Sequence, residues 1–218
     1  MIKASNIFKS YGDLEVLKGV SIHIKEAEIV AIVGASGAGK TSLLQILGTL
    51  EKASNSDASL EINQKNIQGL NAKALAAFRN TNIGFIFQFH QLLPEFTALE
   101  NVCLPAFING SSKQEAQKEA MELLNFLGLS KRIHHKPDAL SGGEQQRVAV
   151  ARALINKPAV IFADEPSGNL DSESAQNLHE LFFTLREKYH QTFVLVTHND
   201  TLAQMADRTL TMVDGHIL

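Results

Sequence analysis

The sequence has few of the features that secreted or membrane-spanning proteins need. It contains a single cysteine, Cys103, which excludes an internal disulfide and fits a reducing cytosol; we interpret it as a partly buried free thiol. No apolar stretch approaches the roughly 20 residues of a membrane span. The opening stretch MIKASNIFKS lacks the apolar core of a signal peptide. If the protein works at a membrane, we therefore expect a partner to hold it there.

A large excess of charge of one sign is also absent. The 20 Lys and Arg residues nearly balance the 23 Asp and Glu residues, and the formal net charge of −3 gives no electrostatic reason to expect nucleic-acid binding. With 218 residues, 44% of them hydrophobic, the chain can bury a full core and has the size of one α/β domain. Since no repeat or low-complexity linker divides it, we expect a single domain over residues 1–218.

Three short apolar runs predict parallel strands that are covered on both faces. They are rich in β-branched residues, do not alternate with polar residues, and are each followed at once by polar residues. The runs are Ile29–Val33, Ala159–Ala163 and Phe193–Thr197. In contrast, Val20–Ile24 alternates apolar and polar side chains and predicts a half-exposed antiparallel strand. The fold class that follows is α/β.

Helices are predicted from their capping signals. Capping-box patterns begin at Thr97 and at Ser112, the second followed by apolar residues at helical spacing. A further helix is expected from about Gly142, and another after Ser172. The single domain is therefore expected to have two lobes: a core lobe at 1–88 and 157–218, and a helical lobe at 89–156.

A glycine-rich stretch after the first buried strand fits the phosphate-loop pattern G-x-x-x-x-G-K-[ST]. Its glycines let backbone N–H groups curl round phosphate oxygens, and the following helix points its positive N-terminal end at them. Lys40 would reach the β- and γ-phosphates, and Thr41 would ligate Mg²⁺. Because an apolar strand precedes it and an apolar helix follows, we prefer this reading to a chance glycine-rich turn. The expected nucleotide-binding residues are Gly34, Ala35, Ser36, Gly37, Ala38, Gly39, Lys40, Thr41 and Ser42.

Two acidic residues close the second buried strand. Asp164 can hold the Mg²⁺ shell, and Glu165 can accept a proton from an attacking water. Acidic residues are common at strand ends, but here they accompany a phosphate loop. The third strand leads to His198, and since ligands bind at the carboxyl ends of parallel strands, Gly34, Asp164 and His198 are expected to converge on one crevice. We interpret the other histidines as solvated or structural.

The stretch LSGGEQQR, residues 140–147, opens a predicted helix. Ser141 can cap it, and its two glycines leave backbone N–H groups bare, which favours a second anion site, although an ordinary capped helix has the same local features. Followed by VAVARAL, the stretch resembles the signature motif of the ATP-binding subunits of ABC transporters, and the resemblance covers essentially the whole chain. It implies a P-loop NTPase fold of ABC type, with a mainly parallel core sheet, an antiparallel β subdomain and a helical subdomain.

The resemblance also implies a head-to-tail dimer of this chain that holds ATP and Mg²⁺. In such a dimer, the signature of one subunit closes over the ATP on the P-loop of the other. The signature residues are Ser141, Gly142, Gly143 and Glu144. The implied cycle is ATP-driven closure, then hydrolysis and reopening.

The same resemblance assigns roles to five residues. Tyr11 matches the aromatic residue that stacks on adenine, with an exposed turn tyrosine as the alternative. Gln88, after an apolar run, matches the glutamine that senses the γ-phosphate and Mg²⁺. Glu165 matches the general base, His198 the γ-phosphate contact, and Asp171 the acid of the loop that crosses the dimer interface.

One stretch departs from the family pattern. Between the P-loop helix and the next buried strand, members usually carry a Pro-Thr-Ser-Gly-type turn and an Asn-Gly hairpin. This chain has KASNSDASLEINQKN at 52–66 instead. The departure leaves the local turn geometry open, while the residues expected to carry the chemistry are all present.

The motif content also indicates partners. With one copy of each motif, the chain is expected to pair with a second nucleotide-binding subunit, which is another copy of itself. It is also expected to bind integral membrane transporter subunits. ABC proteins of translation and DNA repair are a rival class, but they usually carry two cassettes or long insertions. A P-loop kinase would leave LSGGEQQR unexplained. No nucleic-acid partner is expected.

Within the family, FQFHQLLPEFTALENVCLP at 87–105, with SGNLD and FRNTNIGFIF, is similar to the ATPases of bacterial lipoprotein-releasing systems. Those subunits lie peripherally on the cytoplasmic face of the inner membrane. ATPases of macrolide-type exporters and of cell-division complexes are the alternatives. The resemblance implies that an apolar loop, called the greasy loop below, receives a short helix of the membrane partner. The alternative is that its side chains simply pack against the helical lobe. The loop residues are Phe89, Leu92, Leu93 and Phe96.

Overall fold

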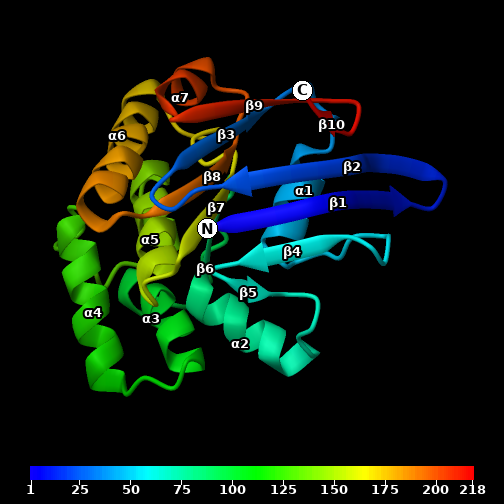
Figure 1. The fold of residues 1–218 in the computed structure, drawn as a ribbon. Helices are drawn as coiled ribbons and strands as arrows, with labels where there is room; N and C mark the ends of the chain where they lie inside the picture. The colour runs from blue at the N-terminus through cyan, green and yellow to red at the C-terminus, as the bar shows by residue number, and fades with distance from the viewer.

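A six-stranded sheet runs through the centre of the protein, which a computed structural model describes over residues 1–218 (Figure 1). Its order is β10-β9-β3-β8-β7-β6, and all neighbours are parallel except the edge pair β10 and β9. The parallel strands predicted at the three apolar runs are confirmed. The strands are β3 (Ile29–Val33), β6 (Ile83–Phe87), β7 (Val160–Asp164), β8 (Thr192–Val196), β9 (Arg208–Val213) and β10 (His216–Ile217).

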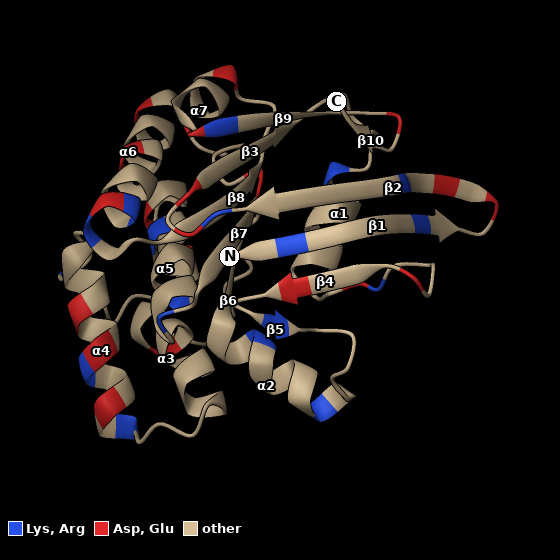
Figure 2. Ribbon diagram, viewed as in Figure 1, with Lys and Arg blue, Asp and Glu red and all other residues tan.

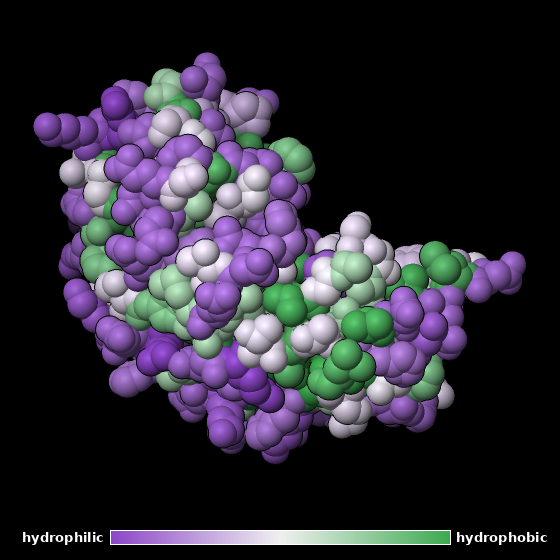
Figure 3. Space-filling view, turned by 90° about the horizontal axis from the view of Figure 1, so that it is seen from above, coloured by the Kyte–Doolittle hydropathy of each residue, from purple (hydrophilic) through white to green (hydrophobic).

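A smaller antiparallel sheet of order β2-β1-β4-β5 lies beside the first, and helix α1 (Lys40–Leu47) contacts both. Its strands are β1 (Ile2–Tyr11), β2 (Leu14–Ile24), β4 (Ser59–Ile62) and β5 (Lys65–Asn66). Val20, Ile22 and Ile24 of β2 are buried and the residues between them are exposed, which confirms the predicted antiparallel strand. The turn between β1 and β2 projects as an arm, and the surface is hollowed between this arm and the helical body (Figure 3).

The remaining helices cover the faces and one end of the larger sheet. They are α2 (Ala72–Asn82), α3 (Ala98–Ile108), α4 (Lys113–Phe126), the 3₁₀ turn η1 (Pro137–Ala139), α5 (Gly142–Leu154), α6 (Ser172–Tyr189) and α7 (Asp200–Met205). The capping boxes at Thr97, Ser112 and Ser141 each form both of their hydrogen bonds. The predicted helix starts are therefore confirmed, because each of these N-caps satisfies backbone N–H groups that the helix itself leaves free.

Each face of the larger sheet contributes side chains to a separate hydrophobic cluster. On one face, Ile161 and Phe193 pack with α3, α4, α5 and α6. On the other, Val160 and Phe162 pack with α1 and the smaller sheet. Neighbouring residues of a strand point to opposite faces, so a strand covered on both sides must be apolar throughout. Because the first cluster runs from α3 and α4 into the sheet, these helices and the sheet share one core.

The single cysteine and the charged side chains can now be placed in the fold. Cys103 lies in α3 with 1% of its surface exposed, and burial raises the pKa of its thiol to about 11. It is therefore a buried, unreactive thiol. No helix combines the length and the apolar character needed to cross a membrane. Basic and acidic side chains are interspersed over the helices and strands (Figure 2).

The stretch that departs from the family pattern is held to β1 by side chains. The Asn55 side chain accepts a hydrogen bond from the Phe8 backbone N–H (3.0 Å) and donates one to the Asn6 carbonyl oxygen (2.8 Å), as a neighbouring strand would. Further on, Asn63 and Gln64 join β4 to β5 with φ angles of 49° and 62°. Two left-handed residues in a two-residue hairpin loop are typical of a type I′ turn. The family's Asn-Gly hairpin is thus kept as Asn-Gln.

Replacing Gln64 by glycine is expected to stabilise the protein. Gln64 is exposed, and its left-handed backbone is unfavourable for a residue with a Cβ. After allowing for the greater freedom of glycine in the unfolded chain, the net gain should be about 0.5–1 kcal/mol in the free energy of unfolding. Urea denaturation followed by circular dichroism measures it. Gln64→Ala, which keeps a Cβ, is the control and should leave stability nearly unchanged; equal effects of the two variants would contradict the turn.

Candidate nucleotide-binding and catalytic site

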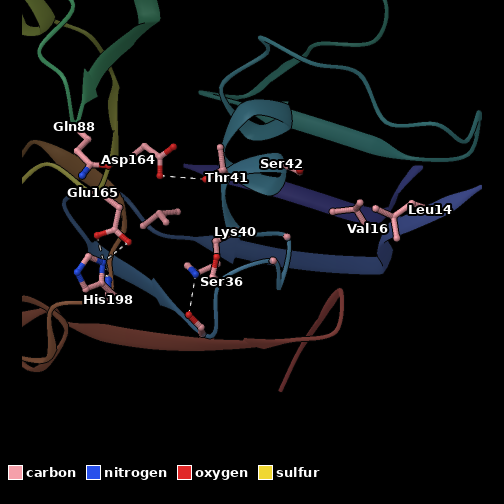
Figure 4. Close-up of a pocket in the computed structure, with 14 residues that line it drawn as sticks. Leu14, Val16, Ser36, Lys40, Thr41, Ser42, Gln88, Asp164, Glu165 and His198 are labelled. Atoms are coloured by element: carbon pink, nitrogen blue, oxygen red, sulfur yellow. Dashed lines mark hydrogen bonds and ion pairs between the residues drawn. The ribbon is translucent and has the colours of Figure 1, made fainter. Parts of the chain in front are cut away.

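The carboxyl ends of the parallel strands meet at a cavity of about 550 Å³ (Figure 4). Strand β3 leads into the glycine-rich loop, β7 into the acidic pair and β8 into the histidine, which is the convergence expected from the sequence. The expected residues that line the cavity are Gly34, Ser36, Gly37, Gly39, Lys40, Thr41, Ser42, Gln88, Asp164, Glu165 and His198. Leu14, Val16 and Val196 complete its wall.

The glycine-rich loop brings backbone donors and one cation to the cavity. A Cβ on Gly34 would lie 2.2 Å from the Met212 carbonyl oxygen, so only glycine fits there. Gly39 precedes α1 with φ 101° and no side chain caps this helix, which leaves N–H groups for an anion. Lys40 donates from Nζ to the carbonyl oxygens of Gly34 (2.8 Å) and Ala35 (2.9 Å). Its ammonium group therefore lies inside the loop, where phosphates would bind.

Three oxygen-bearing side chains gather beside the loop, where they could hold a cation. Thr41 Oγ1 lies 3.4 Å from Asp164 Oδ1, and Gln88 lines the same cavity. Burial raises the pKa of Asp164, and the charge of Glu165 raises it further, so a divalent cation would stabilise the ionised carboxylate. Hydroxyl, carboxylate and amide oxygens suit Mg²⁺. No group of three or more His, Cys, Asp or Glu residues could hold a metal alone, so Mg²⁺ here would share its ligands with phosphates and water.

Glu165 and His198 form a hydrogen-bonded pair at the cavity wall. The Glu165 carboxylate lies 2.9 Å from His198 Nδ1 and accepts a hydrogen bond from the His198 backbone N–H at 3.2 Å. The Glu165 side chain is 19% exposed, so the cavity reaches it while most solvent does not. Its backbone is left-handed, with φ 47°, and its N–H donates to the Val196 carbonyl oxygen. A strained residue that its surroundings hold in place is typical of a functional position.

The apolar wall of the cavity comes from β2, which sequence reasoning missed. Figure 4 shows Leu14 and Val16 on the side of the loop away from Glu165, where a flat base could lie. Tyr11, expected to stack on adenine, does not line the cavity. Tyr11 is 47% exposed and pairs with Leu14 across the β1–β2 ladder. The centre of its ring lies 4.8 Å from Lys9 Nζ. In the sequence, the only signal for this wall is that Tyr11 lies just before the short loop that leads to Leu14.

The signature residues lie outside this cavity. Ser141 and Gly142 are exposed at the start of α5. The Glu144 carboxylate accepts from the Ser141 backbone N–H and from Arg132 Nε, both at 2.9 Å, and these bonds lower the Glu144 pKa. Gly143 backs onto α6, where a Cβ would lie 2.9 Å from Ser174 Oγ. The chain therefore presents a second helix N-terminus that its own cavity does not use.

The loop after Glu165 joins the signature region to the cavity. Asp171 caps α6, accepting from the Ser174 backbone N–H (2.9 Å) and hydroxyl (2.8 Å), and these bonds lower its pKa. Ser174 in turn packs against Gly143 of the signature. Asn169, which the sequence did not single out, contacts Gln88. Signature, acidic pair and glutamine are thus linked through one short loop.

The greasy loop after Gln88 is divided between surface and core. Phe89 is 74% exposed, and Leu93 and Phe96 are exposed to a lesser degree. Leu92 packs against the hydrophobic cluster of the helical lobe. Arg152 of α5 donates to the His90 and Gln91 carbonyl oxygens and fixes the loop. Three of the four side chains are therefore free to meet a partner.

Comparisons with known proteins show which family the chain resembles and which relatives it is similar to. A family profile described as ABC transporter matches residues 17–168. Lipoprotein-releasing system ATP-binding proteins LolD are similar over the full chain: the protein of Bacteroides fragilis is 59% identical and covered over 100% of both chains, and that of Bacteroides thetaiotaomicron is 61% identical, covered over 100% of this chain and 99% of its own.

Solved structures show the same architecture. The ATP-binding cassette MJ0796, in a dimeric post-hydrolysis state bound to ADP and Pi, superposes with a TM-score of 0.90 at 39% identity, covering 100% of this chain and 96% of its own. A second dimeric structure of that cassette gives a TM-score of 0.90 at 40% identity over the same shares. The similarity therefore extends over the whole chain.

Proposed function

Since the chain belongs to the ABC transporter family, we propose that it is the ATP-hydrolysing subunit of a membrane complex that releases lipoproteins from the bacterial inner membrane. The observation that carries this proposal is the convergence of the phosphate loop, Asp164, Glu165 and His198 on one cavity. The match to lipoprotein-releasing ATP-binding proteins over the full chain supports the cargo. The subunit lies peripherally on the cytoplasmic face of that membrane.

The cavity residues suit hydrolysis of a triphosphate. A water oxygen bonds to the γ-phosphorus while the bond to the β–γ bridging oxygen breaks, which gives ADP and phosphate. The loop N–H groups and Lys40 hold the phosphates and the developing charge. Glu165 takes a proton from the water, and such a base contributes roughly 10²–10⁴ in rate. His198, whose Nδ1 lies 2.9 Å from the Glu165 carboxylate, would also contact the γ-phosphate.

Two further groups complete the nucleotide site. Thr41, Gln88 and Asp164 would hold Mg²⁺, which neutralises charge on the β- and γ-phosphates. The donor set fits this ion because all three side chains offer hard oxygen atoms. Adenine would lie against the apolar wall of β2. Tyr11, which pairs with Leu14 across the β1–β2 ladder, would stack on it from outside the cavity.

A second copy of this chain completes the site. Its signature residues Ser141, Gly142, Gly143 and Glu144 close head-to-tail over the γ-phosphate, with Asp171 at the interface. An exposed helix N-terminus with two glycines provides backbone N–H groups for that charge. This arrangement explains why the signature lies outside the cavity of its own chain. The related cassette MJ0796 is dimeric in both of its structures.

The greasy loop docks the membrane subunits. Phe89, Leu93 and Phe96 offer apolar surface to a short helix of the partner, while Leu92 supports the loop from the helical lobe. The loop begins at Gln88, so docking is joined directly to the nucleotide site. ATP-driven closure of the dimer can then move the membrane partner.

Reconstitution with the membrane subunits tests the proposal. The complex in proteoliposomes should release a lipoprotein to an acceptor only when ATP is hydrolysed. The variant Leu93→Asp with Phe96→Asp should keep ATP affinity but weaken co-purification with the membrane subunits by at least about tenfold, because charges replace anchor residues of the contact. Met121→Asp with Leu218→Asp is the matched control: both residues are exposed and lie outside the loop.

Two results would contradict it. A complex that hydrolyses ATP but leaves lipoproteins in the liposomes would refute the cargo. Normal co-purification of the Leu93→Asp, Phe96→Asp variant, with normal stimulated ATPase activity, would refute the docking loop.

A further inference from the structure

We infer that Asn169 is a positioning residue that fixes which end of the Gln88 side-chain amide faces the nucleotide cavity. The two side chains form a reciprocal pair. Gln88 Nε2 donates to Asn169 Oδ1 at 3.0 Å, and Asn169 Nδ2 donates to the Gln88 backbone oxygen at 3.3 Å. The inference rests on the proposed role of Gln88 as a ligand of Mg²⁺.

The orientation follows from donors and acceptors alone. A backbone carbonyl can only accept, so the Asn169 amino group must face the Gln88 backbone, and its Oδ1 then faces the Gln88 side chain. An amide oxygen can only accept as well, so Gln88 must present Nε2 to it. The remaining atom, Gln88 Oε1, is left for the cavity. Mg²⁺ binds oxygen and not the amino group, so this is the productive orientation.

Asn169 can hold the Gln88 amide in one orientation because its own loop is fixed in place. The Gly168 backbone N–H donates to the Glu165 carbonyl oxygen at 3.0 Å, and Asp171 is anchored as the N-cap of α6. At Gly168 a Cβ would lie 2.9 Å from Gln88 Nε2, so the loop approaches the glutamine as closely as glycine allows. The pair therefore joins the end of β6 to the loop that carries the proposed base.

Without Asn169, the Gln88 amide would be free to rotate. A half-turn about its last bond exchanges Oε1 and Nε2 at nearly equal shape, so part of the population would offer the wrong atom to the metal. Losing a residue that orients a metal ligand typically weakens metal affinity about 10- to 100-fold. The same loss should leave metal-free nucleotide binding unchanged, since Asn169 does not line the cavity.

The test is a double-mutant cycle read by metal binding. In the Glu165→Gln background, which keeps ATP intact, Mn²⁺ is titrated into the ATP-bound protein and free Mn²⁺ is followed by electron paramagnetic resonance. Asn169→Ala and Gln88→Ala should each weaken Mn²⁺ binding about tenfold or more. The double variant should bind no more weakly than Gln88→Ala alone, because Asn169 acts through Gln88. In EDTA, Asn169→Ala should leave ATP affinity unchanged, since Asn169 does not line the cavity, and the double variant should bind ATP as Gln88→Ala does.

The outcomes separate this inference from the function. If Gln88→Ala weakens Mn²⁺ binding but Asn169→Ala does not, or if the two losses add, the positioning role is overturned and the proposed function stands. If Gln88→Ala leaves Mn²⁺ binding unchanged, both the inference and the proposed metal shell are overturned. Asn169 is exposed, so its replacement should not impair folding, and a matching ATP affinity in EDTA confirms this.

Discussion

Replacing Glu165 by glutamine is expected to abolish ATP hydrolysis while ATP still binds. The amide cannot accept the proton of the attacking water, so the rate should fall by roughly 10²–10⁴ or more. Glutamine has the same shape and its oxygen can still accept the backbone N–H of His198, which lies 3.2 Å from the carboxylate. The left-handed backbone at this residue is unaffected. The loss should therefore appear in kcat and not in nucleotide affinity.

The same variant should accumulate as a dimer when ATP is present, because the closed state is no longer consumed. Size-exclusion chromatography with and without ATP measures this, and a phosphate-release assay measures turnover. Glu173→Gln is a matched control: this exposed glutamate lies in the first turn of α6, outside the cavity, and its replacement should leave turnover normal. Wild-type hydrolysis by Glu165→Gln would remove the base assigned here.

Lys40→Ala is expected to lose ATP affinity. The ammonium group lies inside the phosphate loop, bonded to the Gly34 carbonyl oxygen at 2.8 Å and the Ala35 carbonyl oxygen at 2.9 Å. A hydrogen bond to a charged group contributes about 1.5–3 kcal/mol, so losing even one contact to the phosphates should weaken binding by roughly 10- to 150-fold. Calorimetric titration with ATP in the presence of Mg²⁺ measures the change.

The comparison with another lysine shows whether the effect is local. Lys113 begins α4 and is exposed, so Lys113→Ala should bind ATP as the unmodified protein does. Alanine is a good helix former, so neither change should unfold its helix. Unchanged ATP binding by Lys40→Ala would refute the phosphate site. Together, the lysine and glutamate variants should separate binding from chemistry: the first loses both, the second only turnover.

Local signals accounted for much of the fold. Capping-box patterns at Thr97 and Ser112, and the N-cap residue Ser141, marked three helix starts correctly, because a cap needs only residues three positions apart. The unalternating apolar runs identified the central strands, because a strand covered on both faces must be apolar throughout. The short strands β4 and β5 and helices α2 and α7 had no comparable signal. Their packing, not their composition, decides their structure.

The nucleotide site also combines residues that the sequence identified with residues that only the structure brought together. The sequence by itself determined the phosphate loop, the Asp164–Glu165 pair and the signature, since each is a contiguous motif whose backbone geometry is local. Only the tertiary structure decided that Leu14 and Val16 form the apolar wall and that Asn169 faces Gln88. Those residues lie far apart along the chain, and their meeting depends on the strand order and on loops whose close approach no local pattern encodes.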